Sequence, residues 1–194
     1  MDNRGFLRST GAWLIVGSPI GMGVGIKEGI APALFGTTEN IVMQGIVIVA
    51  NALVLVGVIG LARSGAAGDG WLARVGLVIA LVASVLFLPF EVLVAINLEL
   101  GGMLLGLSAL AQGLGLLLVG IAVLRTGRWG SWHRFIPLLC GLYTFLVLIP
   151  ALALSDGYNA WALASWQIPF ALLGVALYQQ GAAPEQSVSV RQAA

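Results

Sequence analysis

Six runs of apolar residues divide the chain, and each is about as long as a bilayer core requires. A hydrocarbon core of about 30 Å needs about 20 helical residues. Each run is too long and too uniformly apolar for the alternating strands of a barrel. The pattern therefore predicts an all-α fold, an integral membrane bundle of six transmembrane helices. Their expected positions are about 11–33, 41–62, 75–97, 101–124, 135–154 and 160–178.

The arginines predict how this bundle is oriented. All eight arginines fall before, between or after the predicted spans on one side of the membrane, and Lys27 is the only base toward the other side. Because basic loops stay in the cytoplasm, we expect both termini to be cytoplasmic. Residues 1–180 are expected to form a single transmembrane domain and 181–194 a disordered cytoplasmic tail. The expected location is the plasma (inner) membrane of a prokaryote.

Composition agrees with the hydropathy pattern and excludes several classes of protein. The chain is 59% hydrophobic and 9% charged, whereas soluble domains contain about 25% charged residues. A net charge of +1 without a basic stripe excludes a nucleic-acid partner. Cys140 and His133 are each the only residue of their type, so we expect neither a disulfide, nor a metal site, nor a serine–histidine–aspartate triad. No cofactor is expected.

Glu91 is the clearest candidate for chemistry inside the membrane, where ionisable groups are costly and often functional. Counted from Arg74, it lies about 25 Å up its helix, in the exoplasmic third of the bilayer. Lys27 reaches about the same level on the first helix. We therefore predict that Glu91 faces the interior and has a polar partner. Lys27 is the first candidate, with Gln44 or Gln167 as further donors.

Other polar and aromatic side chains gather around the same depth or near the midplane, whereas the cytoplasmic half of every span is almost purely apolar. A water-filled pore would need polar residues along its whole length, so a channel is disfavoured. One interpretation is a polar cavity that opens outward; the alternative is side chains that only reach to the outer interface. The candidate ligand-binding residues are Lys27, Gln44, Asn51, Phe87, Gln112, Trp166 and Gln167.

Three classes of function fit this pattern. The first is a binding or transport subunit that holds a lipophilic small molecule. The chain has six spans in under two hundred residues, and in size it resembles the substrate-capture subunits of vitamin importers. The second is an intramembrane enzyme with Glu91 as general acid on an isoprenoid-like substrate. Leu88-Pro89-Phe90-Glu91 is similar to the Pro-x-Glu segment of membrane lycopene cyclases, although their usual second acid is missing here. The third is a structural or accessory subunit without a ligand.

Small residues predict how the helices associate. Gly17, Gly21, Gly25 and Gly29 recur every four residues on one face of the first span, which favours a close helix crossing. This face serves either packing within the chain or a hinge or oligomer contact. Segments 55–65 and 117–127 also resemble each other, which indicates either a parallel hairpin repeat or shared composition. The expected partners are membrane lipids and a lipophilic small molecule, and a homo-oligomer or a partner membrane subunit stays open.

Overall fold

The computed structural model confirms the six-helix membrane fold. It describes residues 2–155 and 158–182, and within these residues six helical segments are long and apolar enough to cross a membrane. No strand occurs in this part of the chain. The five spans built from a single α-helix are α1 (Asn3–Ile30), α2 (Thr38–Arg63), α3 (Trp71–Ile96), α4 (Leu98–Thr126) and α7 (Ala160–Ala182).

The remaining span, Ser131–Ala153, is a composite of four short helices. A 3₁₀ turn, η1 (Ser131–Phe135), leads into α5 (Ile136–Tyr143), which continues as the π-helical turn η2 (Thr144–Leu148) and ends in α6 (Ile149–Ala153). Pro150 explains part of this irregularity, because proline has no backbone N–H to donate to the preceding turn. A π turn within a helix accommodates such a lost bond.

Two helices extend beyond their predicted limits at the chain ends. α1 begins at Asn3 instead of near residue 11, because the Asp2 side chain caps the helix by accepting from the backbone N–H groups of Arg4 and Gly5. α7 continues through Gly181 and Ala182, where the tail was expected to begin. The rest of the predicted tail, 183–194, lies outside the described residues.

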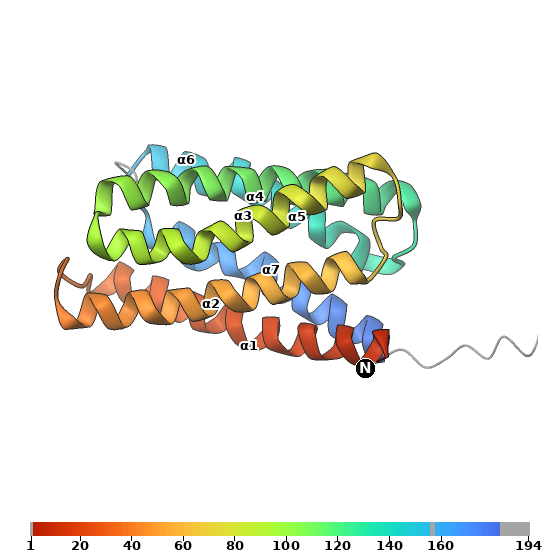
Figure 1. Cartoon of the computed structure of the whole chain (residues 1–194), viewed down its shortest axis with the longest axis horizontal. Coiled ribbons are helices and arrows are strands. Elements are labelled where there is room, and N and C mark those ends of the chain that lie inside the picture. Colours follow the sequence, from red (N-terminus) through yellow and green to blue (C-terminus); the bar gives the residue numbers. More distant parts are fainter. Residues whose placement is uncertain (1, 156–157, 183–194) are drawn as a thin grey trace, which may run out of the picture.

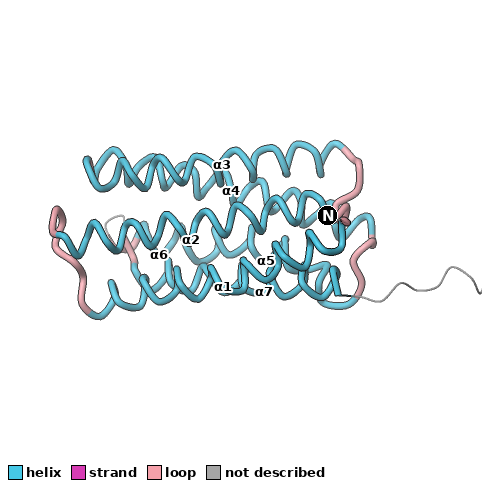
Figure 2. Tube along the Cα trace, turned by 60° about the horizontal axis from the view of Figure 1, so that its bottom comes forward, coloured by secondary structure: helices cyan, strands magenta, loops and turns pink. Residues whose placement is uncertain are grey.

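The spans run side by side, with their loops at the two ends of the molecule (Figure 1, Figure 2). Each helix packs against its neighbour in the order α1, α2, α3, α4, α5 and α7, and α7 returns to α1. The spans therefore close into a ring, and α7 also touches α2. The N-terminus and the C-terminal end of α7 lie at the same end (Figure 1). Which membrane face this end occupies stays a prediction.

Gly17, Gly21, Gly25 and Gly29 of α1 lie at close contacts within the chain. A Cβ atom added at Gly21, Gly25 or Gly29 would lie less than 3.0 Å from atoms of α7, and one at Gly17 would meet Leu53 of α2. Small residues let the backbones of membrane helices approach closely. The α1–α7 contact is thus a crossing that side chains larger than hydrogen would hold apart.

The two resembling segments end in the same local way. In α2 and α4 the last helical turns are followed by glycines with positive φ, 67° at Gly65 and 62° at Gly127. Ser64 and Thr126 each donate a side-chain hydrogen bond to the carbonyl three residues earlier. These features are common to helix C-termini, and the repeat itself stays a prediction.

Charge separates the two ends of the bundle. The end that carries the start of α1 and the C-terminal end of α7 is called here the arginine-rich end. Its described arginines are Arg4, Arg8, Arg63, Arg74, Arg125, Arg128 and Arg134. The opposite end is called the acidic end. There Lys27 of α1 forms ion pairs with Glu28, at 3.1 Å, and with Glu39 in the first turn of α2. The pair with Glu39 joins the end of α1 to the start of α2.

The tryptophans near the helix ends divide into two groups. Trp13, Trp71, Trp132 and Trp161 are exposed, as expected for rings that lie at the headgroup level. Trp129 is buried instead, and it packs edge-on against His133 with the ring centroids 6.4 Å apart. Trp129 therefore does not present its ring to the interface.

Candidate intramembrane carboxylate site

Glu91 points into the bundle from the part of α3 nearer the acidic end. Its side chain is 7% exposed, and it lies five residues before the end of α3 at Ile96, about 8 Å along the helix axis. This confirms the prediction that Glu91 faces the interior. Burial of a carboxyl group requires hydrogen-bond partners, because an unpaired charge in the hydrocarbon region costs several kcal/mol.

Two side-chain amides of α2 hold the Glu91 carboxyl group. Asn51 Nδ2 donates to Oε1 at 2.9 Å, and Gln44 Nε2 donates to Oε2. Gln44 Nε2 also lies 3.1 Å from the backbone carbonyl oxygen of Glu91. Gln44 and Asn51 are seven residues apart, so they share one face of α2, two turns apart. Each carboxyl oxygen therefore receives one neutral donor from the same neighbouring helix.

Lys27 does not take part in this site. Its ammonium group is bound by Glu28 and Glu39 at the acidic end, and no ion pair joins it to Glu91 among the described residues. The predicted Lys27–Glu91 pair is wrong. Equal depth was its basis, but Lys27 lies in the last turn of α1, where the carboxylates of its own turn and of α2 are nearer. The Glu91 site consequently has only neutral donors.

A single face of α3 continues the site toward the middle of the membrane. Ser84, Phe87 and Glu91 are spaced by three and four residues, so they lie on the same face of the helix. Phe87 packs against Trp166 of α7, with ring centroids 5.8 Å apart. Ser84 Oγ accepts a 2.7 Å hydrogen bond from Gln112 Nε2 of α4. One stripe of α3 thus contacts α2, α4 and α7.

The predicted residues therefore do not form one cluster. Gln44 and Asn51 touch Glu91, Phe87 and Trp166 form an aromatic pair one turn below it, and Gln112 binds Ser84 two turns below. Gln167 faces another direction, toward α1, since its amide would lie 2.6 Å from a Cβ added at Gly21. Phe90, the other phenylalanine beside Glu91, lines a groove on the membrane side.

Two of the buried hydroxyl residues, Ser84 and Ser18, lie on helix faces that the sequence had pointed to, although neither residue was itself predicted. Ser84 could have been found from its spacing, because it lies seven residues before Glu91 and so shares its face. Ser18 is buried in α1. It could have been found in a similar way, because it lies one turn from Gly21 on the face predicted to form the helix crossing. Serine is common in membrane helices and often bonds only to its own backbone, which is why neither was singled out.

Several buried polar atoms in this interior have no hydrogen-bond partner among the described residues. They are Ser18 Oγ, Gln112 Oε1, Trp166 Nε1 and Gln167 Oε1. Buried polar groups are normally satisfied by protein, water or a ligand. Their presence on α1, α4 and α7 shows that the bundle core has more hydrogen-bonding capacity than its own side chains use.

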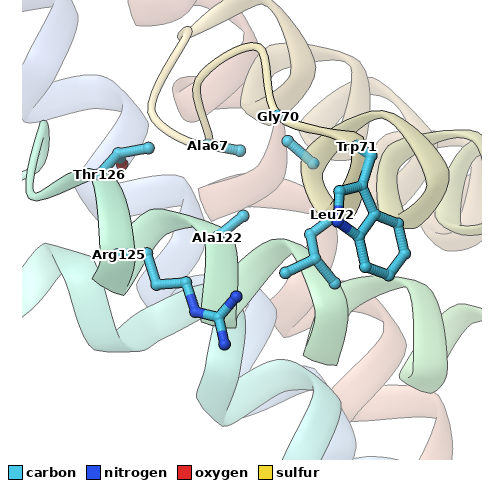
Figure 3. Close-up of a pocket in the computed structure, with 8 residues that line it drawn as sticks. Ala67, Gly70, Trp71, Leu72, Ala122, Arg125 and Thr126 are labelled. Atoms are coloured by element: carbon cyan, nitrogen blue, oxygen red, sulfur yellow. The ribbon is translucent and has the colours of Figure 1, made fainter.

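The cavity predicted in the outer half is not seen at Glu91. One pocket of about 200 Å³ lies at the arginine-rich end, between the start of α3 and the end of α4 (Figure 3). A second, of about 490 Å³, is an apolar groove between α3 and α4. Glu91 lines neither of them, so the outward cavity stays a prediction. Comparison with protein-family models, with curated proteins and with solved structures finds no match.

Proposed function

We propose that this polytopic membrane protein binds a lipophilic small molecule whose amine or other cationic group is recognised by the Glu91 carboxylate. The observation that carries the proposal is the donor set of Glu91, which consists of the neutral amides of Gln44 and Asn51. Neutral donors orient a carboxylate but do not balance its charge. A cationic ligand would supply the missing charge.

The carboxylate retains capacity to accept more hydrogen bonds. Its two oxygens can accept about four bonds in all, and the two amides use one site on each oxygen. An N–H group of a ligand could take a remaining site without displacing either amide. Gln44 is only half-buried and lies nearer the acidic end than Asn51, so its movement is the simplest way to open a path to Glu91.

The aromatic pair beneath the carboxylate favours the same class of ligand. Phe87 is one turn from Glu91, and Trp166 packs against it from α7. Aromatic faces attract cations, with tryptophan the strongest, by about 0.5–2 kcal/mol depending on desolvation. The apolar body of such a ligand would lie along this pair, and the unpartnered Trp166 indole N–H provides a further donor.

The intramembrane enzyme remains the second candidate. Phe87 and Trp166 near Glu91 would suit a carbocation as well as an amine. A general acid must carry a proton on one oxygen, and each Glu91 oxygen accepts one amide bond and keeps a free site that a proton could occupy. What favours binding of a cationic ligand is that both donors to Glu91 are neutral amides, which leave its charge unbalanced.

Identification of co-purified molecules tests the proposal. The full chain is purified in mild detergent, extracted with organic solvent, and the extract is analysed by mass spectrometry for wild type, Glu91→Gln and Glu99→Gln. Glu99 is the matched control, since it is an exposed carboxylate in the first turn of α4. We expect one lipophilic amine or cation to be retained by wild type and Glu99→Gln and lost from Glu91→Gln.

A second variant separates binding from folding and from catalysis. Phe87→Leu keeps the carboxylate and its amides but removes an aromatic face, so we expect reduced retention with an unchanged gel-filtration profile. If Glu91→Gln retains the same molecules as wild type, the proposal is wrong. Chemical conversion of the retained molecule by wild type but not by Glu91→Gln would select the enzyme instead.

A further inference from the structure

The pocket at the arginine-rich end has the chemistry of an anion site at the membrane surface. Figure 3 shows Ala67 and Gly70 of the α2–α3 loop above it, and Leu72 between Trp71 and Arg125. Trp71 is 70% exposed, and Arg125 is exposed in the last turn of α4. The pocket has a volume of about 200 Å³. An arginine and an exposed indole together are typical of the headgroup level.

Arg125 is available to bind a ligand, unlike several of the arginines around it. Arg128 pairs with Asp69 at 3.5 Å and donates to the Gly65 carbonyl oxygen at 2.9 Å. Arg63 stacks on Phe6. For Arg125, by contrast, no hydrogen bond or ion pair occurs with any described residue. Its guanidinium has five N–H donors in a planar fork that matches two phosphate oxygens.

The acidic residue of the loop above the pocket does not pair with the Arg125 guanidinium. Asp69 stands beside Gly70 in the loop above the pocket, but its carboxylate is 86% exposed and is paired with Arg128. Thr126, which also lines the pocket, donates its hydroxyl to the carbonyl oxygens of Ala66 and Val123. The pocket therefore has a net positive charge that no lining side chain neutralises.

An apolar groove lies deeper along the α3–α4 hairpin, separated from this pocket by the close contact between Gly76 and Gly115. Its volume is about 490 Å³, and its wall includes Val78, Val82 and Leu86 of α3 and Leu107 and Ala111 of α4. Val78 is seven residues from Trp71, and Ala111 is fourteen residues from Arg125. Such multiples of seven keep residues on nearly one face of a helix. The groove thus begins about 10 Å from Trp71 along the α3 axis.

Close helix contacts border the groove at both ends. Toward the arginine-rich end, the backbones of Gly76 in α3 and Gly115 in α4 are so close that neither position has room for a Cβ atom. Toward the acidic end, Gly101 of α4 has the same close contact with Val94 of α3. Between these contacts the helices leave the groove, whose exposed walls include Val78, 60% exposed, and Leu107, 55% exposed. A membrane-facing groove with apolar walls is complementary to a hydrocarbon chain.

We propose that this side of α3 and α4 binds a phospholipid with an anionic head group. Arg125 pairs with the phosphate, Trp71 packs beside the head group, and one acyl chain lies in the groove. The occupant follows from the order of the two features, because a charged pocket at the end of the helices and an apolar groove deeper in the membrane match the two parts of a phospholipid. Basic pockets between membrane helices bind acidic head groups in this way. The site is separate from Glu91 and does not depend on the proposed function.

Native mass spectrometry of the full chain in detergent tests the head-group contact. Phosphatidylglycerol and phosphatidylcholine with identical acyl chains are titrated against wild type, Arg125→Gln and Arg134→Gln. Arg134 is the matched control, an exposed arginine at the same end that stacks on Phe135 outside the pocket. We expect wild type to prefer phosphatidylglycerol and Arg125→Gln to bind it about fivefold more weakly, the effect of one basic residue at an anionic surface.

Three outcomes would overturn the site. They are equal binding of the two lipids by wild type, unchanged binding of phosphatidylglycerol by Arg125→Gln, and an equal loss in Arg125→Gln and Arg134→Gln, which would reflect general attraction to the arginine-rich end. The groove is tested by Leu107→Trp, which fills it, against Met103→Trp, an exposed α4 position outside it. Only Leu107→Trp should weaken binding of both lipids, and equal effects of the two would exclude the groove.

Discussion

The contact between α1 and α7 at Gly25 predicts a large difference between two alanine substitutions on the same helix. A Cβ atom at Gly25 would lie 2.8 Å from the Ala164 Cβ and 2.9 Å from its Cα and backbone N. Backbone atoms cannot rotate away, so α7 itself would have to move. Gly23 is the matched control, because a Cβ there meets nothing within 4 Å.

The expected difference in stability between the two variants is the cost of overpacking, because their effects on helix propensity are the same. Both replace glycine by alanine inside a helix, which favours the helix by about 0.8–1 kcal/mol in each case. Only Gly25→Ala adds the cost of overpacking, about 1–3 kcal/mol. The helix terms cancel in the comparison, so Gly25→Ala should be less stable than Gly23→Ala by about 1–3 kcal/mol. For a chain of this size that corresponds to about 2–12 °C in melting temperature.

The lone cysteine provides the assay. Cys140 is fully buried in α5, so a thiol-reactive fluorescent dye reacts with it only when the bundle opens on heating. Melting curves in the same detergent are compared for wild type, Gly23→Ala and Gly25→Ala, with Cys140→Ala as the signal control. Gly21→Ala should fall between the two variants, because its added Cβ meets the flexible Gln167 amide. If Gly25→Ala melts at or above Gly23→Ala, α1 and α7 do not cross closely at this residue.

Two further predictions concern the buried site and the orientation. Asn51→Leu should lower the free energy of unfolding by about 1–3 kcal/mol, because it leaves a Glu91 oxygen without its donor. The same substitution in a Glu91→Leu background should cost much less. A double-mutant cycle of melting temperatures measures both costs, and equal costs would refute the Asn51–Glu91 contact. Asp69→Cys at the arginine-rich end should resist a membrane-impermeant thiol reagent in intact cells, whereas Glu99→Cys at the acidic end should react. Labelling of Asp69→Cys from outside would reverse the predicted orientation.

The structure also decides which loop residue can carry the cysteine for an orientation test. The loop between the second and third spans was identified from its arginines, and any residue in it would serve as an orientation probe by sequence alone. Ala66 in that loop is only 1% exposed, however, whereas Asp69 is 86% exposed at its side chain. A probe at Ala66 would fail to react on either side of the membrane, because the loop folds back against Thr126 of α4.

The sequence by itself determined the membrane class, the number of spans and the burial of Glu91. These follow from properties of single segments, since a run of about 20 apolar residues spans the bilayer whatever its neighbours are. A lone carboxylate within such a run is then strongly driven away from lipid. The lengths of the helices beyond the apolar runs were missed, because polar caps such as Asp2 act through local hydrogen bonds that hydropathy does not register.

Only the tertiary structure decided which residues meet. Lys27 and Glu91 lie at about the same depth, but depth restricts position along one axis, whereas contact also depends on helix order and rotation about each helix axis. α2 stands beside α3 in the ring, so Gln44 and Asn51 reach Glu91 while Lys27 binds Glu28 and Glu39. The pocket at Arg125 and the groove beyond it likewise arise from two helices together, and neither helix alone encodes them.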